Sequence, residues 1–140
     1  MEDTTLYEKL SKIDKLKQHK RKIDQLREVE DFTIRSIFMA AYGKHINLKM
    51  PEGAPPYKPN ENGKLLSHER FNKVIKAIMN FKDHQWKREK VFIDLLEYVH
   101  EDDAPIFIAM KDKNITEVFP SFTRDVMAEA YPKFVKGGDK

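Results

Sequence analysis

The chain has 140 residues and no cysteine, with 40% hydrophobic residues, 35% charged residues and a formal net charge of +3 at pH 7. These values indicate one compact domain with a modest core and a heavily charged surface. Without cysteine there are no disulfides, thiol nucleophiles or thiolate metal sites, and no apolar run approaches the roughly 20 residues of a membrane span. We also expect no signal peptide.

The N-terminal part is predicted to be helical. Apolar residues recur at helical spacing over residues 5–30; they are Leu6, Leu10, Ile13, Leu16, Ile23 and Leu26. Residues 17–22 are charged or polar, so either the helix breaks there or that turn lies in solvent. A second helix, with Phe32 on its apolar surface, is expected from Asp31 to Gly43.

A proline-rich segment follows at residues 44–65, and we call its residues 48–65 the strap. Four of the seven prolines lie in Met50–Glu61, and proline excludes a helix there. The candidate partner-binding residues are Pro55, Pro56, Tyr57 and Lys58. An aromatic-lined groove of a partner protein could bind them, but we favour packing of Tyr57 on the helices of its own chain, because long loops are usually anchored.

The remainder is predicted to be helical as well. Helices are expected over residues 67–82, 83–100, 101–114 and 121–131. Ser67 is expected to cap the first of them, and strand patterns are nearly absent. The predicted fold is all-α: a single compact bundle of five to six helices interrupted by a Pro-rich loop at about residues 48–64. This single domain is expected to occupy residues 1–132. It is divided into N-terminal helices at 1–43, the Pro-rich segment at 44–65 and C-terminal helices at 66–132, and residues 133–140 are expected to form a flexible tail.

Charge is distributed unevenly. Residues 43–92 contain eleven Lys/Arg against five Asp/Glu, whereas residues 93–131 contain three against nine. The two regions either attract each other within one fold or leave a basic surface for nucleic acid. The candidate nucleic-acid residues are Lys20, Arg21, Lys22, Trp86, Lys87, Arg88 and Lys90. Trp86 could stack on bases, although a tryptophan that seals the edge of a helical core is the favoured interpretation.

Acidic residues near position 100 offer the densest set of possible metal ligands. Glu97 precedes His100 by one turn, and residues 101–103 are all acidic. We favour a helix-capping role for Asp102 and Asp103, since Pro105 follows and acids stabilise a helix N-terminus. A metal-dependent nuclease remains a minor alternative. No metal, cofactor or catalytic residue is predicted.

Several segments resemble a known protein family. They are MPEGAPPYKPNE at Met50–Glu61, KREKVFIDLLEYV at Lys87–Val99, DDAPIFIAMKDKN at Asp102–Asn114 and FTRDVMAEAYP at Phe122–Pro132. Together they resemble a small uncharacterised family of T-even-type tailed phages, including phages of marine bacteria. The chain departs from the family pattern at Met50, where leucine is usual, and at Tyr131, where phenylalanine is usual. The resemblance implies expression in the cytoplasm of an infected bacterial host and carries over no catalytic residue.

Our leading expectation is a non-enzymatic phage accessory protein. It would bind a host or phage protein of the replication, transcription or assembly machinery. The alternative is a nucleic-acid-binding accessory factor that uses the basic middle segment. No membrane partner is expected, and the sequence does not indicate the oligomeric state.

Overall fold

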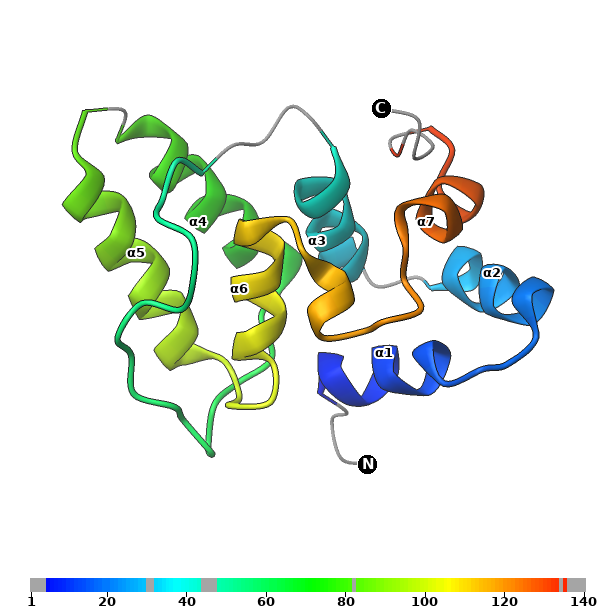
Figure 1. The fold of residues 1–140 in the computed structure, drawn as a ribbon. Coiled ribbons are helices and arrows are strands. Elements are labelled where there is room, and N and C mark those ends of the chain that lie inside the picture. The colour runs from blue at the N-terminus through cyan, green and yellow to red at the C-terminus, as the bar shows by residue number, and fades with distance from the viewer. Residues whose placement is uncertain (1–4, 30–31, 44–47, 82, 134, 136–140) are drawn as a thin grey trace.

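The computed structural model describes residues 5–29, 32–43, 48–81, 83–133 and 135. This part of the chain is helical, with one isolated bridge between Lys64 and Val99 and no strand, which confirms the all-α prediction. The elements are α1 (Leu6–Asp14), α2 (His19–Glu28), α3 (Phe32–Tyr42), α4 (His68–Asn80), α5 (Gln85–Tyr98), α6 (Ala104–Asp112), the 3₁₀ turn η1 (Ile115–Glu117) and α7 (Arg124–Ala130) (Figure 1). Asp31 and the residues 44–47, 134 and 136–140 of the predicted loop and tail lie outside the described residues.

The described residues contain seven α-helices, where five to six were predicted. The extra helix arises in the first segment, which breaks between Asp14 and His19. Leu16 is partly buried against the core, whereas Lys15 and Lys17 are exposed. A continuous helix would have to bury part of a charged turn, so the chain leaves the helix there and keeps these ammonium groups in water.

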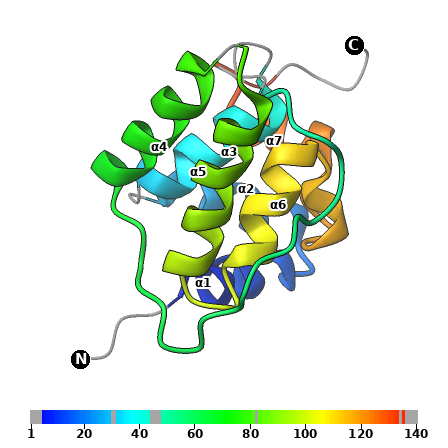
Figure 2. The ribbon, with the colours of Figure 1, turned by 90° about the vertical axis from the view of Figure 1, so that its left-hand side faces the viewer.

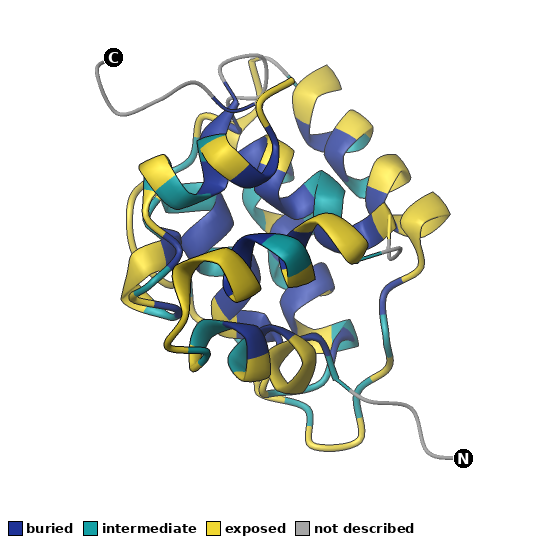
Figure 3. Ribbon diagram, turned by 90° about the vertical axis from the view of Figure 1, so that its right-hand side faces the viewer, coloured by how far each residue is buried: buried dark blue, intermediate teal, exposed yellow. Residues whose placement is uncertain are grey.

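α3 lies at the centre of the fold. It contacts α6 and α4, while α4 pairs with α5 on one side and α2 pairs with α7 on the other (Figure 1). Side chains from every α-helix join one cluster of buried apolar residues. The largest fully buried aromatic residues are Phe38, Phe71, Phe92, Phe107, Phe119 and Phe122. Figure 3 shows the outcome as buried inward faces and exposed outward faces.

The ends of two helices are fixed by residues distant in sequence. The Lys113 ammonium donates to the carbonyls of Ala40, at 2.8 Å, and Gly43, at 3.1 Å, at the end of α3. The Tyr131 hydroxyl donates to the Leu26 carbonyl at 2.5 Å near the end of α2. Cationic and hydroxyl donors satisfy carbonyls that a helix end leaves unpaired.

The strap follows α5 and α6 before it turns and rises to α4 (Figure 2). At its second half, the Lys58 amide donates to the Glu97 carboxylate at 2.9 Å, and the Asn60 side chain donates to the Glu97 carbonyl at 3.0 Å. The Lys64 amide then donates to the Tyr98 carbonyl at 3.0 Å. Proline cannot supply backbone donors, so these bonds come from Lys58, between Pro56 and Pro59, and from Asn60 and Lys64, after the last proline of the segment.

Two capping predictions have different outcomes. Ser67 caps α4 as predicted, with its hydroxyl accepting from the Arg70 amide at 3.1 Å. Asp103, in contrast, makes no side-chain hydrogen bond to α6; its carboxylate accepts from the amides of Leu6, at 3.2 Å, and Tyr7, at 2.8 Å. It therefore stabilises the start of α1 instead of its own helix.

The chain beyond α7 also differs from a simple tail. Val135 is only 2% exposed, and its amide donates to the Tyr131 carbonyl at 3.0 Å. Burial of an apolar side chain in the shared core fixes this residue. Within the described residues, no helix combines the length and apolar composition that would span a membrane.

Candidate functional site

The candidate residues of the strap lie against their own chain. Tyr57 and Pro55 are half-buried, with Tyr57 packed against the core, whereas Pro56 and Lys58 are exposed. The first half of the strap, together with Glu89, Phe92 and Lys111, encloses a hollow of about 200 Å³. The geometry supports the favoured, intramolecular interpretation of Tyr57.

A buried ion pair holds this half of the strap. Lys111 and Asp112 contact each other with side chains that are only 3% and 6% exposed. The Lys111 ammonium also donates to the Pro51 carbonyl at 2.8 Å, and Asp112 accepts from the Gly53 amide at 2.9 Å. Both charges therefore have hydrogen-bonding partners in the strap, which a buried pair requires. The strap is a braced structural segment.

Trp86 does not seal the core edge, which corrects the favoured interpretation of this residue. It lies in the first turn of α5 and is 65% exposed, more than any other large apolar residue described. Met79, in the last turn of α4, is 40% exposed, and Phe81 between the helices is half-buried. The Lys87 ammonium lies 5.5 Å from the ring centroids of both Phe81 and Trp86. We call Met79, Phe81, Trp86 and Lys87 the hairpin tip.

Arg88 supports the hairpin tip from below and is not available to a nucleic acid. Arg88 is only 7% exposed. The guanidinium donates to the Phe81 carbonyl at 2.5 Å and, through Nε and Nη2, to the Lys49 carbonyl at 3.3 and 3.0 Å. It thus joins the end of α4 to the start of the strap. The planar fork of arginine suits this role in a way that a lysine ammonium does not.

We predict that Arg88→Lys lowers the free energy of unfolding by about 2 kcal/mol, because a buried cation would keep only part of these bonds. Chemical denaturation monitored by circular dichroism measures the change. Lys90→Ala is the matched control. Lys90 is exposed, and Asp94, at 3.3 Å, is its one ion-pair partner among the described residues, so its loss should change stability by less than about 0.5 kcal/mol. Equal effects of the two changes would show that Arg88 does not brace the turn.

The predicted nucleic-acid residues do not form one surface. Lys20 and Arg21 are exposed at the start of α2, whereas Lys22 is only 9% exposed. α2 and the hairpin tip lie at opposite ends of the molecule (Figure 1). Helical periodicity explains the burial of Lys22, because this residue precedes the buried Ile23 and lies on the inward side of α2. A single site that combines Lys20 with Trp86 is therefore excluded by the fold.

A shallow groove between α4 and α5 was not predicted from the sequence. Two hollows of about 370 and 280 Å³ share Arg70, Val74 and Val91 as lining residues. The Arg70 guanidinium lies 4.4 Å from the ring centroid of Tyr98 at its edge. Val74 and Val91 follow the apolar period of their helices. They are half-buried because the neighbouring helix covers only part of each side chain.

The acidic residues near position 100 do not converge. The Glu97 carboxylate accepts from the Lys58 amide, and Asp103 accepts from the start of α1. His100 contacts Asp102 at 3.7 Å. Across the described ranges, no group of three or more His, Asp or Glu side chains could hold a metal ion. These residues support other segments of the fold.

The comparisons place the chain in a family. Residues 9–117 match the profile of a family of unknown function, DUF6433, and this segment contains the strap, the groove and the hairpin tip. No curated protein and no solved structure matches the chain. Because the matched segment covers well over half of the 140 residues, the chain belongs to the DUF6433 family.

Proposed function

We propose that the protein is a protein-binding module and that the hairpin tip is its docking site. The observation that carries this proposal is the exposure of Trp86, at 65%, on a turn that buried Arg88 holds in place. Tryptophan is the residue most typical of interface hot spots, where a large rigid side chain gains affinity when a partner covers it. A braced turn loses little conformational entropy on binding, which favours association further.

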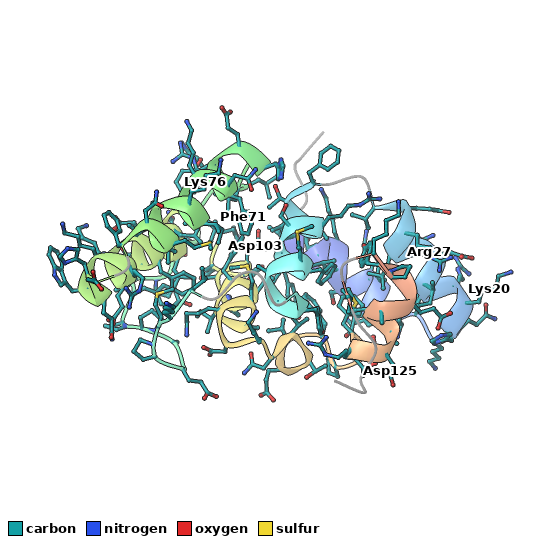
Figure 4. The ribbon with its side chains drawn as sticks, turned by 90° about the horizontal axis from the view of Figure 1, so that it is seen from above. Lys20, Arg27, Phe71, Lys76, Asp103 and Asp125 are labelled. Atoms are coloured by element: carbon teal, nitrogen blue, oxygen red, sulfur yellow. The ribbon has the colours of Figure 1, made fainter. Side chains whose placement is uncertain are left out.

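The charges near the tip favour an acidic partner segment. On α4 and α5, the exposed or half-exposed Lys73, Lys76 and Lys87 make no ion pair with another described residue. Lys76 points away from the molecule on the outer side of α4 (Figure 4). Cations on the two helices that carry an apolar anchor attract carboxylates and steer their approach. The partner in our proposal is therefore a protein segment with an apolar anchor flanked by Asp or Glu.

The resemblance to T-even-type phage proteins supplies the biological setting of the proposal. In this setting the chain is a non-enzymatic accessory protein in the cytoplasm of the infected bacterium. Its partner would belong to the host or phage machinery of replication, transcription or assembly. The finer organisation, in which one compact bundle is interrupted by a Pro-rich loop, is part of the same proposal.

Site-specific crosslinking tests the docking site. A photoreactive residue in place of the exposed Asp83, beside the tip, should crosslink in infected cells to one protein through an acidic segment. A synthetic copy of the crosslinked segment is then titrated while the emission of Trp86, the single tryptophan, is recorded. We expect a blue shift as Trp86 leaves water. Trp86→Ala should weaken binding by roughly 30-fold, as loss of a hot-spot anchor does.

A matched change at the far end of the molecule controls for general effects. Lys20→Ala together with Arg21→Ala should leave the affinity for the peptide unchanged, since α2 lies away from the tip. Crosslinks to a segment without acidic residues would contradict the proposal. So would a peptide that binds wild-type protein and Trp86→Ala equally well.

A further inference from the structure

A second surface, independent of the proposed function, lies where α1 passes into α2. Five cationic residues are exposed within a stretch of ten: Lys12, Lys15, Lys17, Lys20 and Arg21. We call them the basic corner. Figure 4 shows Lys20 at the outer end of α2, where its side chain projects away from the molecule. Among the described residues, none of the five forms an ion pair.

The acidic residue inside this stretch faces the protein. The Asp14 carboxylate accepts from the Ser121 amide at 2.9 Å and from the Ser121 hydroxyl at 2.6 Å. The same hydroxyl also donates to the Asp14 carbonyl, at 3.0 Å. The structure thus commits Asp14 to the loop before α7, and it places the other acidic residue nearby, Asp24, in a half-buried position.

The carboxylate of Glu129, on α7 near the corner, is also in contact with another residue. His19 Nε2 lies 2.8 Å from Glu129 Oε1 on α7, so this carboxylate contacts His19. The first turn of α2 contains no acidic residue, and its N-cap, Gln18, makes no side-chain capping bond. The positive end of the helix therefore adds to the charge of Lys20 and Arg21.

The corner is rigidly presented. Ile13 at the end of α1 and Ile23 and Leu26 on α2 are buried, and α2 contacts both α1 and α7. Lys12, Lys20 and Arg21 thus extend from helices that are anchored in the core, and Lys15 and Lys17 lie on the short link between these helices. Charges on an anchored backbone lose less entropy when they meet a regular polyanion.

We infer that the basic corner binds duplex nucleic acid through its phosphate backbone. A duplex carries about one negative charge per 1.7 Å of its axis, and clustered Lys and Arg displace its counterions. Residues 12–28 contain no Phe, Tyr or Trp, so the corner has no large aromatic platform on which unpaired bases could stack. The corner is expected to contact the phosphate backbone of the duplex without distinguishing its base sequence.

The surface is unsuited to a membrane. Interfacial helices insert a large apolar face into lipid, but the apolar residues of α2, Ile23 and Leu26, are buried in the protein core. The exposed large apolar residues described are Tyr7, Phe32, Met39, Met79 and Trp86, and none lies on residues 12–28. Nucleic acid is accordingly the polyanion that the corner fits.

Fluorescence anisotropy with labelled duplex DNA of mixed sequence tests the inference at several salt concentrations. Five contacts predict that the logarithm of the association constant falls with the logarithm of salt concentration with a slope of up to about −4.5. Lys20→Glu with Arg21→Glu should weaken binding at low salt by roughly tenfold or more and reduce the slope by about 2. Glutamate in the first turn of α2 favours the helix, and circular dichroism verifies that the variant is folded.

The matched control carries the same change of charge elsewhere. Lys73→Glu with Lys76→Glu alters exposed lysines of α4 and should weaken binding far less. The inference is overturned if both double variants lose affinity equally, or if Lys20→Glu with Arg21→Glu binds duplex DNA as wild type does. Binding to phosphatidylserine vesicles without binding to duplex DNA would also overturn it.

Trp86 emission separates this inference from the proposed function. Duplex DNA bound at the corner should leave the emission unchanged, because the hairpin tip lies at the opposite end of the molecule. If the corner inference fails, the peptide titration at the tip is unaffected. DNA that quenches Trp86 would place the contact at the tip and refute the basic corner.

Discussion

Gly63→Ala is expected to lower the free energy of unfolding by about 3 kcal/mol, the upper range for a side chain forced into filled space. A Cβ atom at this position would lie 2.1 Å from the Val99 oxygen, 2.2 Å from the Val99 carbon and 2.4 Å from the His100 nitrogen. All three are backbone atoms, so no side-chain rotation can relieve the overlap. The strap would have to move away from α5 and lose the bond from Lys64 to Tyr98. Urea denaturation measures the loss.

Gly53→Ala separates crowding from backbone preference. Gly53 has a φ of 97°, a conformation that favours glycine, but a Cβ atom added there would have no heavy atom within 4 Å beyond its chain neighbours. The change should therefore lower the unfolding free energy by about 1 kcal/mol, the cost of a left-handed backbone alone. If Gly53→Ala were as destabilising as Gly63→Ala, the close approach of the strap to Val99 would not explain the effect of Gly63→Ala.

Asp103→Ala is the other change with a large expected effect, a loss of about 3 kcal/mol in the free energy of unfolding. Asp103 is 1% exposed, and its carboxylate is the acceptor for the amides of Leu6 and Tyr7. Alanine would leave two buried or partly buried donors without this partner and would leave a cavity, and each such defect costs roughly 1 to 3 kcal/mol. Asp103→Asn, which retains one acceptor oxygen, should recover part of the loss.

The contribution of Asp103 to the free energy of unfolding should also depend on pH. Burial raises the pKa of Asp103, and the amides of Tyr7 and Leu6 and the charge of His100 oppose this rise only in part. The folded protein therefore holds this proton more tightly than the unfolded chain does. Its contribution to stability is complete below the unfolded pKa, about 3.9, and is lost as pH rises through the folded pKa. The stability of wild type minus that of Asp103→Asn should fall with rising pH above about 4, and a rise would contradict the assignment.

The helices were largely predictable because their signals are local. Apolar residues at helical spacing predicted all the segments that became α1 to α7, and Ser67 identified the start of α4. Whether the helix would break after α1 could not be predicted, because the hydrophobic period alone does not determine whether a charged turn stays helical. Phe32, which fitted the apolar pattern, is 63% exposed beside His68. It lies in the first turn of α3, where the period of the helix does not determine what covers it.

Residue roles were harder to predict, because they depend on contacts between distant segments. Arg88 resembled a surface cation until the fold placed the Lys49 carbonyl against it, 39 positions away in sequence. Asp103 fitted a capping role at the start of α6, yet the amides that it binds, those of Tyr7 and Leu6, are 96 and 97 positions away. Trp86 was assigned to the core by average behaviour, whereas the sharp turn before α5 leaves it uncovered. Local chemistry restricted what each side chain could do but not which segment it would meet.

The Asp103 cap also affects the order in which the chain can mature during synthesis. α1 is made before α6, but its amides at Leu6 and Tyr7 are paired only once the Asp103 carboxylate, 97 and 96 positions later, has been made. Asp14 likewise waits for Ser121, and the Leu26 carbonyl waits for Tyr131. The α4 and α5 pair brings together segments that are adjacent in the sequence, and the Lys49 carbonyl that Arg88 binds is made before either helix. The contacts that hold the hairpin tip can therefore form before those that fix the basic corner, which need Ser121 and Tyr131.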